Sequence, residues 1–171
     1  MEIKATSKYD YETARAFYYV LTLKRIVIDI IIFAVLEAIV LLKIFLFGIS
    51  TMMLAVAILI PVELLVICLF HFVGAKRFYN SLGKMKNVEN EFTFFEDSFR
   101  AVSKIEGMNG GSEIKYSMIE KVVEKQDYIY IYQNKRQAFI VDKSTVIGGT
   151  VEDIRNKLIP ILQKKYYYKN K

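Results

Sequence analysis

Two long apolar runs in the first half of the chain constrain the fold more than any other feature. The first occupies residues 26–47 and the second residues 52–73, and only Gly48-Ile49-Ser50-Thr51 separates them. As a helix, each run would be roughly 33 Å long, enough to cross a hydrocarbon core of roughly 30 Å. The sequence therefore predicts a transmembrane helical hairpin.

A buried helical hairpin in a soluble protein is the main alternative. A soluble core helix rarely stays apolar on all faces over such a length. The remainder of a 171-residue chain is also too short to wrap two such helices on every side. A cleaved signal peptide is disfavoured because Glu2, Asp10 and Glu12 precede the first run and a second run follows at once.

The charge pattern predicts how the hairpin is oriented. The chain has a formal net charge of +6, and basic residues flank the apolar runs as Lys24, Arg25, Lys76 and Arg77, whereas the turn carries none. The positive-inside rule then predicts a multi-pass plasma-membrane protein with both termini in the cytoplasm. Because no basic run with interleaved stacking aromatics is present, we expect membrane lipids as partners and no nucleic acid.

Chemistry-bearing motifs are sparse. Cys68 and His71 are the only cysteine and histidine, so an internal disulfide cannot form, and these two residues alone cannot build a zinc site. The sequence contains no phosphate-loop lysine motif, no nucleophile elbow and no His-Glu-x-x-His pair. The glycine-rich residues 107–112 could cradle a phosphate, but we favour a loose turn between strands. We expect no enzyme, no catalytic residue, no metal and no cofactor.

Charged residues inside the apolar runs are the sharpest feature of the sequence. A central Asp or Lys costs roughly 2.5–3.5 kcal/mol on insertion scales. Asp29 and Lys43 lie near the ends of the runs and can reach the interface, but Glu37 and Glu63 lie near the middle. We therefore expect Glu37 and Glu63 to make protein contacts, either inside the hairpin or across an oligomer.

Folding the chain back at residues 49–50 gives these polar residues partners of equal depth. Glu37 then lies at the depth of Glu63, and Asp29 at the depth of His71. We expect an acid–imidazole hydrogen bond between Asp29 and His71. Two carboxylates in hydrocarbon cannot both stay charged without a cation, so at least one glutamate should be protonated and donate to the other or to a neighbouring subunit.

The N-terminal 25 residues are predicted to form a strand and then a helix. Residues 1–8 alternate weakly with period two, and Asp10 is a candidate N-cap for the helical pattern that follows. The end of that helix carries Tyr18 and Tyr19 next to its two basic residues. This pattern fits an aromatic and basic interface belt, or equally a plain packed helix.

From Asn90 the periodicity changes from helix to strand. Strands are predicted at residues 91–96, 99–104, 112–116, 128–132 and 138–141, while residues 118–124 could form a strand or a short helix. Thr150 and Asp153 predict a capping box for a helix over residues 150–163. Its apolar stripe comprises Val151, Ile154, Leu158, Ile161 and Leu162.

The basic end of the chain has two interpretations. Lys164, Lys165 and Lys169 could contact an anionic lipid surface, at about 1 kcal/mol per basic residue. They could instead complement the dipole at a helix C-terminus.

Short strands followed by one closing helix outline a pleckstrin-homology-like (PH-like) half-open barrel. The segments FFEDSF (94–99), IKYSMIEKVVEKQDYIYIY (114–132), AFIVDKSTV (138–146) and VEDIRNKLIPIL (151–162) resemble the YcxB-like family of bacterial membrane proteins. The resemblance implies a short N-terminal segment, a two-helix hairpin and a PH-like domain, and it brings no active site. The chain departs from the pattern at Asp142-Lys143, where a Pro-Lys step is common.

The expected fold class is an α+β membrane protein: a transmembrane two-helix hairpin plus a PH-like antiparallel β half-barrel closed by a C-terminal helix. The expected segments are 1–25, the hairpin 26–73 and a cytoplasmic domain 87–171. We expect a non-enzymatic adaptor for a protein partner or a lipid surface. The alternative is a small transport or assembly subunit that forms a homo-oligomer through Glu37 and Glu63.

Overall fold

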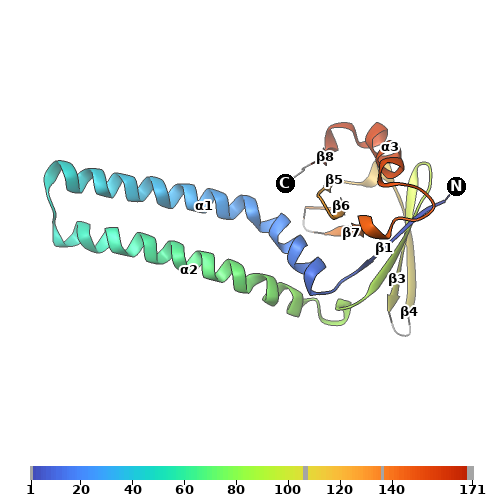
Figure 1. Ribbon diagram of the computed structural model, residues 1–171, viewed down its shortest axis with the longest axis horizontal. Coiled ribbons are helices and arrows are strands. Elements are labelled where there is room, and N and C mark those ends of the chain that lie inside the picture. Colours follow the sequence, from blue (N-terminus) through green and yellow to red (C-terminus); the bar gives the residue numbers. More distant parts are fainter. Residues whose placement is uncertain (1, 106–107, 136, 169–171) are drawn as a thin grey trace. The chain divides into compact units, whose positions relative to one another are not determined.

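The computed structural model describes residues 2–105, 108–135 and 137–168. It divides into two compact units (Figure 1). The first, the β-sheet unit, combines Met1–Thr13 with Leu82–Lys171, and the second, the helical hairpin, is Ala14–Ser81. The N-terminal strand thus belongs to the same unit as the second half of the chain, although the hairpin separates them in sequence.

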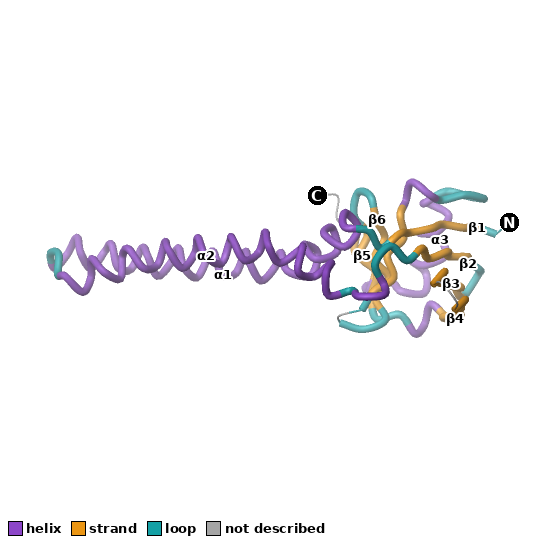
Figure 2. Tube along the Cα trace, turned by 90° about the horizontal axis from the view of Figure 1, so that it is seen from below, coloured by secondary structure: helices purple, strands orange, loops and turns teal. Residues whose placement is uncertain are grey.

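The hairpin consists of two long antiparallel helices, α1 (Tyr11–Phe47) and α2 (Thr51–Ser81) (Figures 1 and 2). Between them Gly48 adopts φ +80°, a conformation that favours glycine at a helix end. The hydroxyl oxygen of Ser50 accepts a hydrogen bond from the Met53 amide at 3.2 Å and caps α2. The turn is one residue shorter than predicted, because Thr51 already belongs to α2.

Both helices are long and apolar enough to cross a membrane, judged by length and composition. In the described chain no residue of α1 from Tyr18 to Phe47 is buried, and Ala75 is the only buried residue of α2. Large apolar side chains remain on the surface, among them Phe45 at 84% exposure and Met52 at 79%. Within this chain, therefore, the apolar runs are not core helices.

The helix α1 begins where the sequence predicts. The carboxylate of Asp10 accepts a hydrogen bond from the Thr13 amide at 2.9 Å, which confirms it as the N-cap. The helix then continues without interruption into the first apolar run.

Sheet A contains β1 (Ile3–Lys8), β2 (Glu89–Phe94), β3 (Ser98–Ile105) and β4 (Met108–Lys115), in that order and all antiparallel. The register of β1 on β2 runs from Ile3 opposite Phe94 to Lys8 opposite Glu89. The expectation that the N-terminal strand joins the sheet is therefore confirmed.

Sheet B contains β5 (Lys121–Glu124), β6 (Tyr128–Tyr132), β7 (Ala138–Asp142) and β8 (Tyr166–Tyr168), in the order β7-β6-β5-β8. The sequence predicted no strand at residues 166–168 and only antiparallel pairing, and both predictions are wrong. The chain reaches β8 through the helix α3 (Val151–Leu162), and this crossover brings it back parallel to β5.

The prediction of a loop for the glycine-rich segment is wrong in the part of that segment that the structure describes. Gly110 and Gly111 lie within β4, opposite Ser103 and Val102. Their ladder hydrogen bonds to β3 outweigh the weak strand propensity of glycine. Gly107 lies outside the described residues.

Within the described ranges, short 3-10 helices link these elements: η1 (Gly83–Met85), η2 (Tyr116–Met118), η3 (Lys143–Thr145) and η4 (Gln163–Lys165). The sequence left open whether residues 118–124 form a strand or a helix. In the structure Met118 ends η2, and residues 121–124 form β5. The β7–α3 connection lies along β1, where the Thr145 hydroxyl donates to the Thr6 carbonyl and accepts from the Thr6 amide, both at 2.9 Å.

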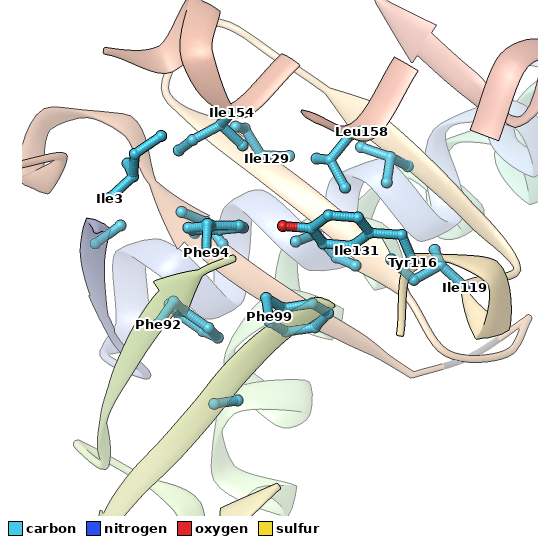
Figure 3. Packing of buried hydrophobic residues seen from close by; sticks show 14 of the residues in the cluster. Ile3, Phe92, Phe94, Phe99, Tyr116, Ile119, Ile129, Ile131, Ile154 and Leu158 are labelled. Carbon is cyan, nitrogen blue, oxygen red and sulfur yellow. The ribbon is translucent and has the colours of Figure 1, made fainter. Parts of the chain in front are cut away.

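The core of the β-sheet unit is an aromatic and aliphatic cluster between the two sheets and α3 (Figure 3). The rings of Phe94 and Phe99 stack with centroids 5.9 Å apart, and Tyr116 stacks on Phe99 at 6.4 Å. The Tyr116 hydroxyl is satisfied by donating to the Phe95 carbonyl at 3.0 Å. Burying these rings supplies much of the apolar contact area of the unit.

The helix α3 closes this core. The predicted capping box is present: the Asp153 amide donates to the Thr150 hydroxyl, and the Thr150 amide donates to the Asp153 carboxylate. Ile154, Leu158 and Leu162 are buried, as the stripe predicted. Ile161 is 41% exposed, so its assignment to the stripe is wrong.

Candidate functional site

Half-buried positions follow one stripe along each helix of the hairpin. On α1 the half-buried positions recur every three or four residues, and the stripe includes Asp29 and Glu37. The matching stripe on α2 includes His71. The members on α1 are Thr22, Ile26, Asp29, Phe33, Glu37, Val40 and Ile44, and those on α2 are Met53, Ala57, Ile60, Leu64, Ile67, His71, Gly74 and Phe78.

Aromatic side chains of α1 and α2 contact one another at the end of the hairpin that lies away from the turn. The His71 ring lies 5.4 Å from Tyr18 and 5.1 Å from Tyr19, measured between ring centroids. The rings of Tyr18 and Phe78 are 5.9 Å apart. At Gly74 an added Cβ would lie 2.1 Å from the Tyr18 hydroxyl, so a larger residue there would require the Tyr18 side chain to shift.

The structure brings the predicted pair Asp29 and His71 to one groove of about 340 Å³. Its other lining residues are Tyr18, Thr22, Arg25, Ile26, Ile67 and Phe70. The Nδ1 atom of His71 lies 3.5 Å from the Thr22 hydroxyl. The histidine partner within hydrogen-bond reach is therefore Thr22, and Asp29 shares the groove with it.

Glu37 and Glu63 lie on different faces of the hairpin. Glu37 is on the α1 stripe, where its Oε2 atom is buried without a hydrogen-bond partner. Glu63 is off the α2 stripe and exposed. In the described part of the chain the two carboxylates are not hydrogen-bonded to each other, so a shared contact would need a second molecule.

The predicted surface lysines and arginines are all accessible where they are described. Lys24, Arg25, Lys76 and Arg77 are exposed on the hairpin, and Arg77 lies 5.6 Å from the centroid of the Phe70 ring. Lys164 and Lys165 are exposed in η4. Lys169 lies outside the described residues.

The β-sheet unit contains a buried charge cluster that the sequence did not reveal. The side chain of Glu124, at the end of β5, is fully buried. Its two oxygens accept hydrogen bonds from Arg155 of α3, Nε to Oε2 at 2.8 Å and Nη2 to Oε1 at 2.7 Å. Lys143 Nζ lies 2.6 Å from Oε1, and the Tyr166 hydroxyl donates to Oε2 at 2.5 Å.

These contacts fix the ionisation of the cluster. Burial alone would raise the pKa of Glu124, but hydrogen bonds from Arg155, Lys143 and Tyr166 outweigh it and lower the pKa to about 2. The hydrogen bond to Glu124 raises the pKa of Arg155. Burial, followed by the bond to Glu124, raises the pKa of Tyr166, so its phenol stays a neutral donor.

The cluster ties four separate elements together. Lys143 also donates to the carbonyl oxygens of Lys125 and Gln126, at 2.7 and 3.1 Å. Arg155 pairs in addition with Glu152 and lies 5.0 Å from the centroid of the Tyr168 ring. The charge cluster therefore links the elements β5, η3, α3 and β8.

A groove of about 400 Å³ lies beside this cluster, between α3 and β8. Arg155, Ile159, Gln163, Tyr166 and Tyr168 line it. In the described residues no group of three or more His, Cys, Asp or Glu side chains could hold a metal ion.

The comparison with protein families supports the resemblance noted in the sequence. A family model described as YcxB-like protein matches residues 94–158.

In residues 94–158 the chain is similar to YcxB-like proteins. The predicted resemblance is thus confirmed for this segment. No curated protein and no solved structure matches the chain.

The YcxB-like match contains three of the four groups of the charge cluster, namely Glu124, Lys143 and Arg155. It ends before Tyr166 and does not include the hairpin. The cluster therefore joins the segment that matches the family model to the C-terminal strand β8 that follows it.

One signal in the sequence could have indicated the cluster. In the strand Lys121–Glu124 the side chains alternate, so Glu124 shares the inward face with Val122. An acidic residue on an inward face needs a cationic partner. The alternation has this meaning only in a strand. Because the sequence left open whether residues 118–124 form a strand or a helix, it did not predict the cluster.

Proposed function

We propose that this chain is a non-enzymatic membrane-anchored adaptor. In this proposal the helical hairpin spans the bacterial plasma membrane, and the β-sheet unit is a PH-like domain on the cytoplasmic side that binds a protein partner or a lipid surface. The observation that carries the proposal is the unburied apolar surface of both helices. Lipid is the environment in which such helices satisfy both their side chains and their backbone.

The charges at the hairpin support the orientation. Lys24, Arg25, Lys76 and Arg77 are exposed, and the turn residues Gly48–Ser50 carry no charge. Basic residues beside the helix ends are retained on the cytoplasmic side. Both soluble segments of the chain then face the cytoplasm.

The arrangement of the β-sheet unit supports a PH-like fold. Two four-stranded sheets enclose one aromatic core, and the C-terminal helix α3 covers it with Ile154 and Leu158. The sheets do not close into a barrel through the described ladders. A half-open sandwich of this kind leaves sheet edges and a helix groove for binding.

Lipid-surface binding can be tested on the full chain in nanodiscs. A fluorophore is placed at Met118, which is 73% exposed in the β-sheet unit, and lipid-bound quenchers report its distance from the surface. We expect quenching in anionic nanodiscs. The quenching should fall when salt is added, and it should also fall in the variant Lys164→Gln/Lys165→Gln. The matched control is Lys84→Gln/Lys86→Gln, which removes the same charge elsewhere.

Partner binding is tested by recovery in mild detergent. The parent chain is compared with Ile154→Asp, which disrupts the β-sheet unit and leaves the hairpin sequence intact. The proposal expects a partner that is retained by the parent and lost from the variant, while both stay in the membrane fraction. If quenching ignores lipid charge and salt, and the parent retains no partner, the adaptor proposal is wrong.

One observation favours a second candidate function, assembly through the helices. Glu63 is exposed on an apolar face, and the buried Oε2 of Glu37 lacks a partner in the described chain. A carboxylic acid on a lipid-facing surface gains from a contact with another helix. A small transport or assembly subunit would use such contacts, and its native size in mild detergent would be a homo-oligomer.

A further inference from the structure

The C-terminal strand β8 fills the open edge of β5. In the described residues three parallel pairs form this ladder: Val122 with Tyr166, Val123 with Tyr167 and Glu124 with Tyr168. Without β8, β5 would be the edge strand of sheet B. An open edge presents unpaired backbone groups that template another strand.

Side-chain contacts make this edge selective for the tail. The Tyr166 hydroxyl reaches Glu124 Oε2 at 2.5 Å, and Tyr166 packs against the core. Two residues later, the Tyr168 ring lies under the Arg155 guanidinium at 5.0 Å. Tyr167, between them, is 47% exposed. The edge thus recognises a strand with a phenol at the first position and an aromatic ring at the third.

The connection between α3 and β8 is strained. Gln163 adopts φ +47° and ψ −115°, a conformation that favours glycine. Its amide still donates to the Ile159 carbonyl at the end of α3. Gln163 lies at the point where the chain leaves α3 and folds back onto its own sheet. Short hinges under strain favour exchange of the segment between two copies.

We propose that the β5 edge is a strand-docking site that accepts the C-terminal strand of a second copy of this chain. Every copy carries both the edge and the fitting strand, so two copies can exchange their tails symmetrically. In the exchanged pair, Tyr166 of one copy bonds Glu124 of the other, and Gln163 relaxes to an ordinary conformation.

Cysteine cross-linking tests the exchange in the full chain. In a Cys68→Ala background, Val123→Cys and Tyr167→Cys place thiols on paired residues, whose separation suits a disulfide. One copy with Val123→Cys and one with Tyr167→Cys, each with its own tag, are co-expressed and oxidised. We expect a covalent dimer that carries both tags, well above that formed by Val123→Cys with Met118→Cys.

The double variant in one chain is the geometric control, and it should also form a disulfide within the chain. If that disulfide forms while the co-expressed pair gives no dimer above the control, exchange between copies is wrong. If neither forms, the docking register itself is wrong, and the proposal fails with it.

The hinge supplies a second readout. Gln163→Gly removes the strain of the folded-back tail, so the dimer yield should fall at least about fivefold. Gln163→Ala removes the side chain but keeps the strain, so its yield should match the parent. Equal yields from Gly and Ala would contradict the role assigned to the hinge.

Discussion

Arg155 of α3 donates two hydrogen bonds to the carboxylate of Glu124 in β5, from Nε to Oε2 at 2.8 Å and from Nη2 to Oε1 at 2.7 Å. The carboxylate is fully buried, whereas the side chain of Arg155 is 23% exposed. The pair fixes the closing helix α3 of the β-sheet unit to sheet B. A buried acid with so many donors is a stability determinant only while it stays ionised.

Replacing Glu124 by Gln should destabilise the β-sheet unit by about 3 kcal/mol, because Arg155 and Lys143 then lack an anionic partner. Hydrogen exchange of β5, β6 and α3 in the full chain measures the loss. The exposed Glu120→Gln is the matched control and should change stability by no more than about 0.5 kcal/mol. Equal protection in the two variants would show that the cluster contributes little.

Stability should also depend on pH through the same group. The pKa of Glu124 lies at about 2, below its ordinary value of 4.5, so its contribution is complete above pH 4.5. It is lost as the pH falls from 4.5 towards 2. The difference in unfolding midpoint between the parent and Glu124→Gln should therefore shrink across that window. A difference that stays constant down to pH 2 would contradict the assigned ionisation.

A charge on the inner face of α3 should unfold the β-sheet unit. Ile154 and Leu158 are both fully buried, and an unpaired carboxylate there costs several kcal/mol. Ile154→Asp or Leu158→Asp should make residues 82–168 sensitive to protease in the full chain. Ile161→Asp, on the exposed face of α3, should leave the resistance intact. Resistance in both core variants would reject the packing of α3.

The glutamates of the hairpin should act between molecules if they act at all. Glu37→Gln/Glu63→Gln should preserve assembly, because an amide still forms hydrogen bonds. Glu37→Leu/Glu63→Leu should weaken helix association by about 0.6–2 kcal/mol. Native size in mild detergent measures the effect. Because Glu63 is the exposed member, Glu63→Leu alone should account for most of it. Unchanged size in the double Leu variant would leave the pair without a role in assembly.

Much of the fold follows from local signals in the sequence. The hairpin is encoded by two long, predominantly apolar runs, and its turn by Gly48 and Ser50. The capping box at Thr150 and Asp153 marks the start of α3. In each case the residues that decide the structure are neighbours along the chain, so the pattern carries the physics directly.

The remaining features depend on contacts between distant residues. Glu124 lies 31 positions from Arg155 and 42 from Tyr166, and no periodicity links them. The glycines of β4 form a strand because β3 supplies the ladder partners. Glu37 lies on the half-buried stripe of α1, whereas Glu63 is exposed on α2. Residue counting predicted that the two would pair, but the direction in which each side chain faces depends on how the helices pack.

The central claim is that the hairpin crosses the membrane with its turn outside and the β-sheet unit inside. Thiol labelling tests it in one experiment, in a Cys68→Ala background. Ile49→Cys reports the turn, where Ile49 is 74% exposed, and Met118→Cys reports the β-sheet unit. A membrane-impermeant maleimide applied to cells with a permeable outer layer should label Ile49→Cys at once. It should label Met118→Cys only after the plasma membrane is opened. Labelling of Met118→Cys in intact cells, or protection of Ile49→Cys, would contradict the account.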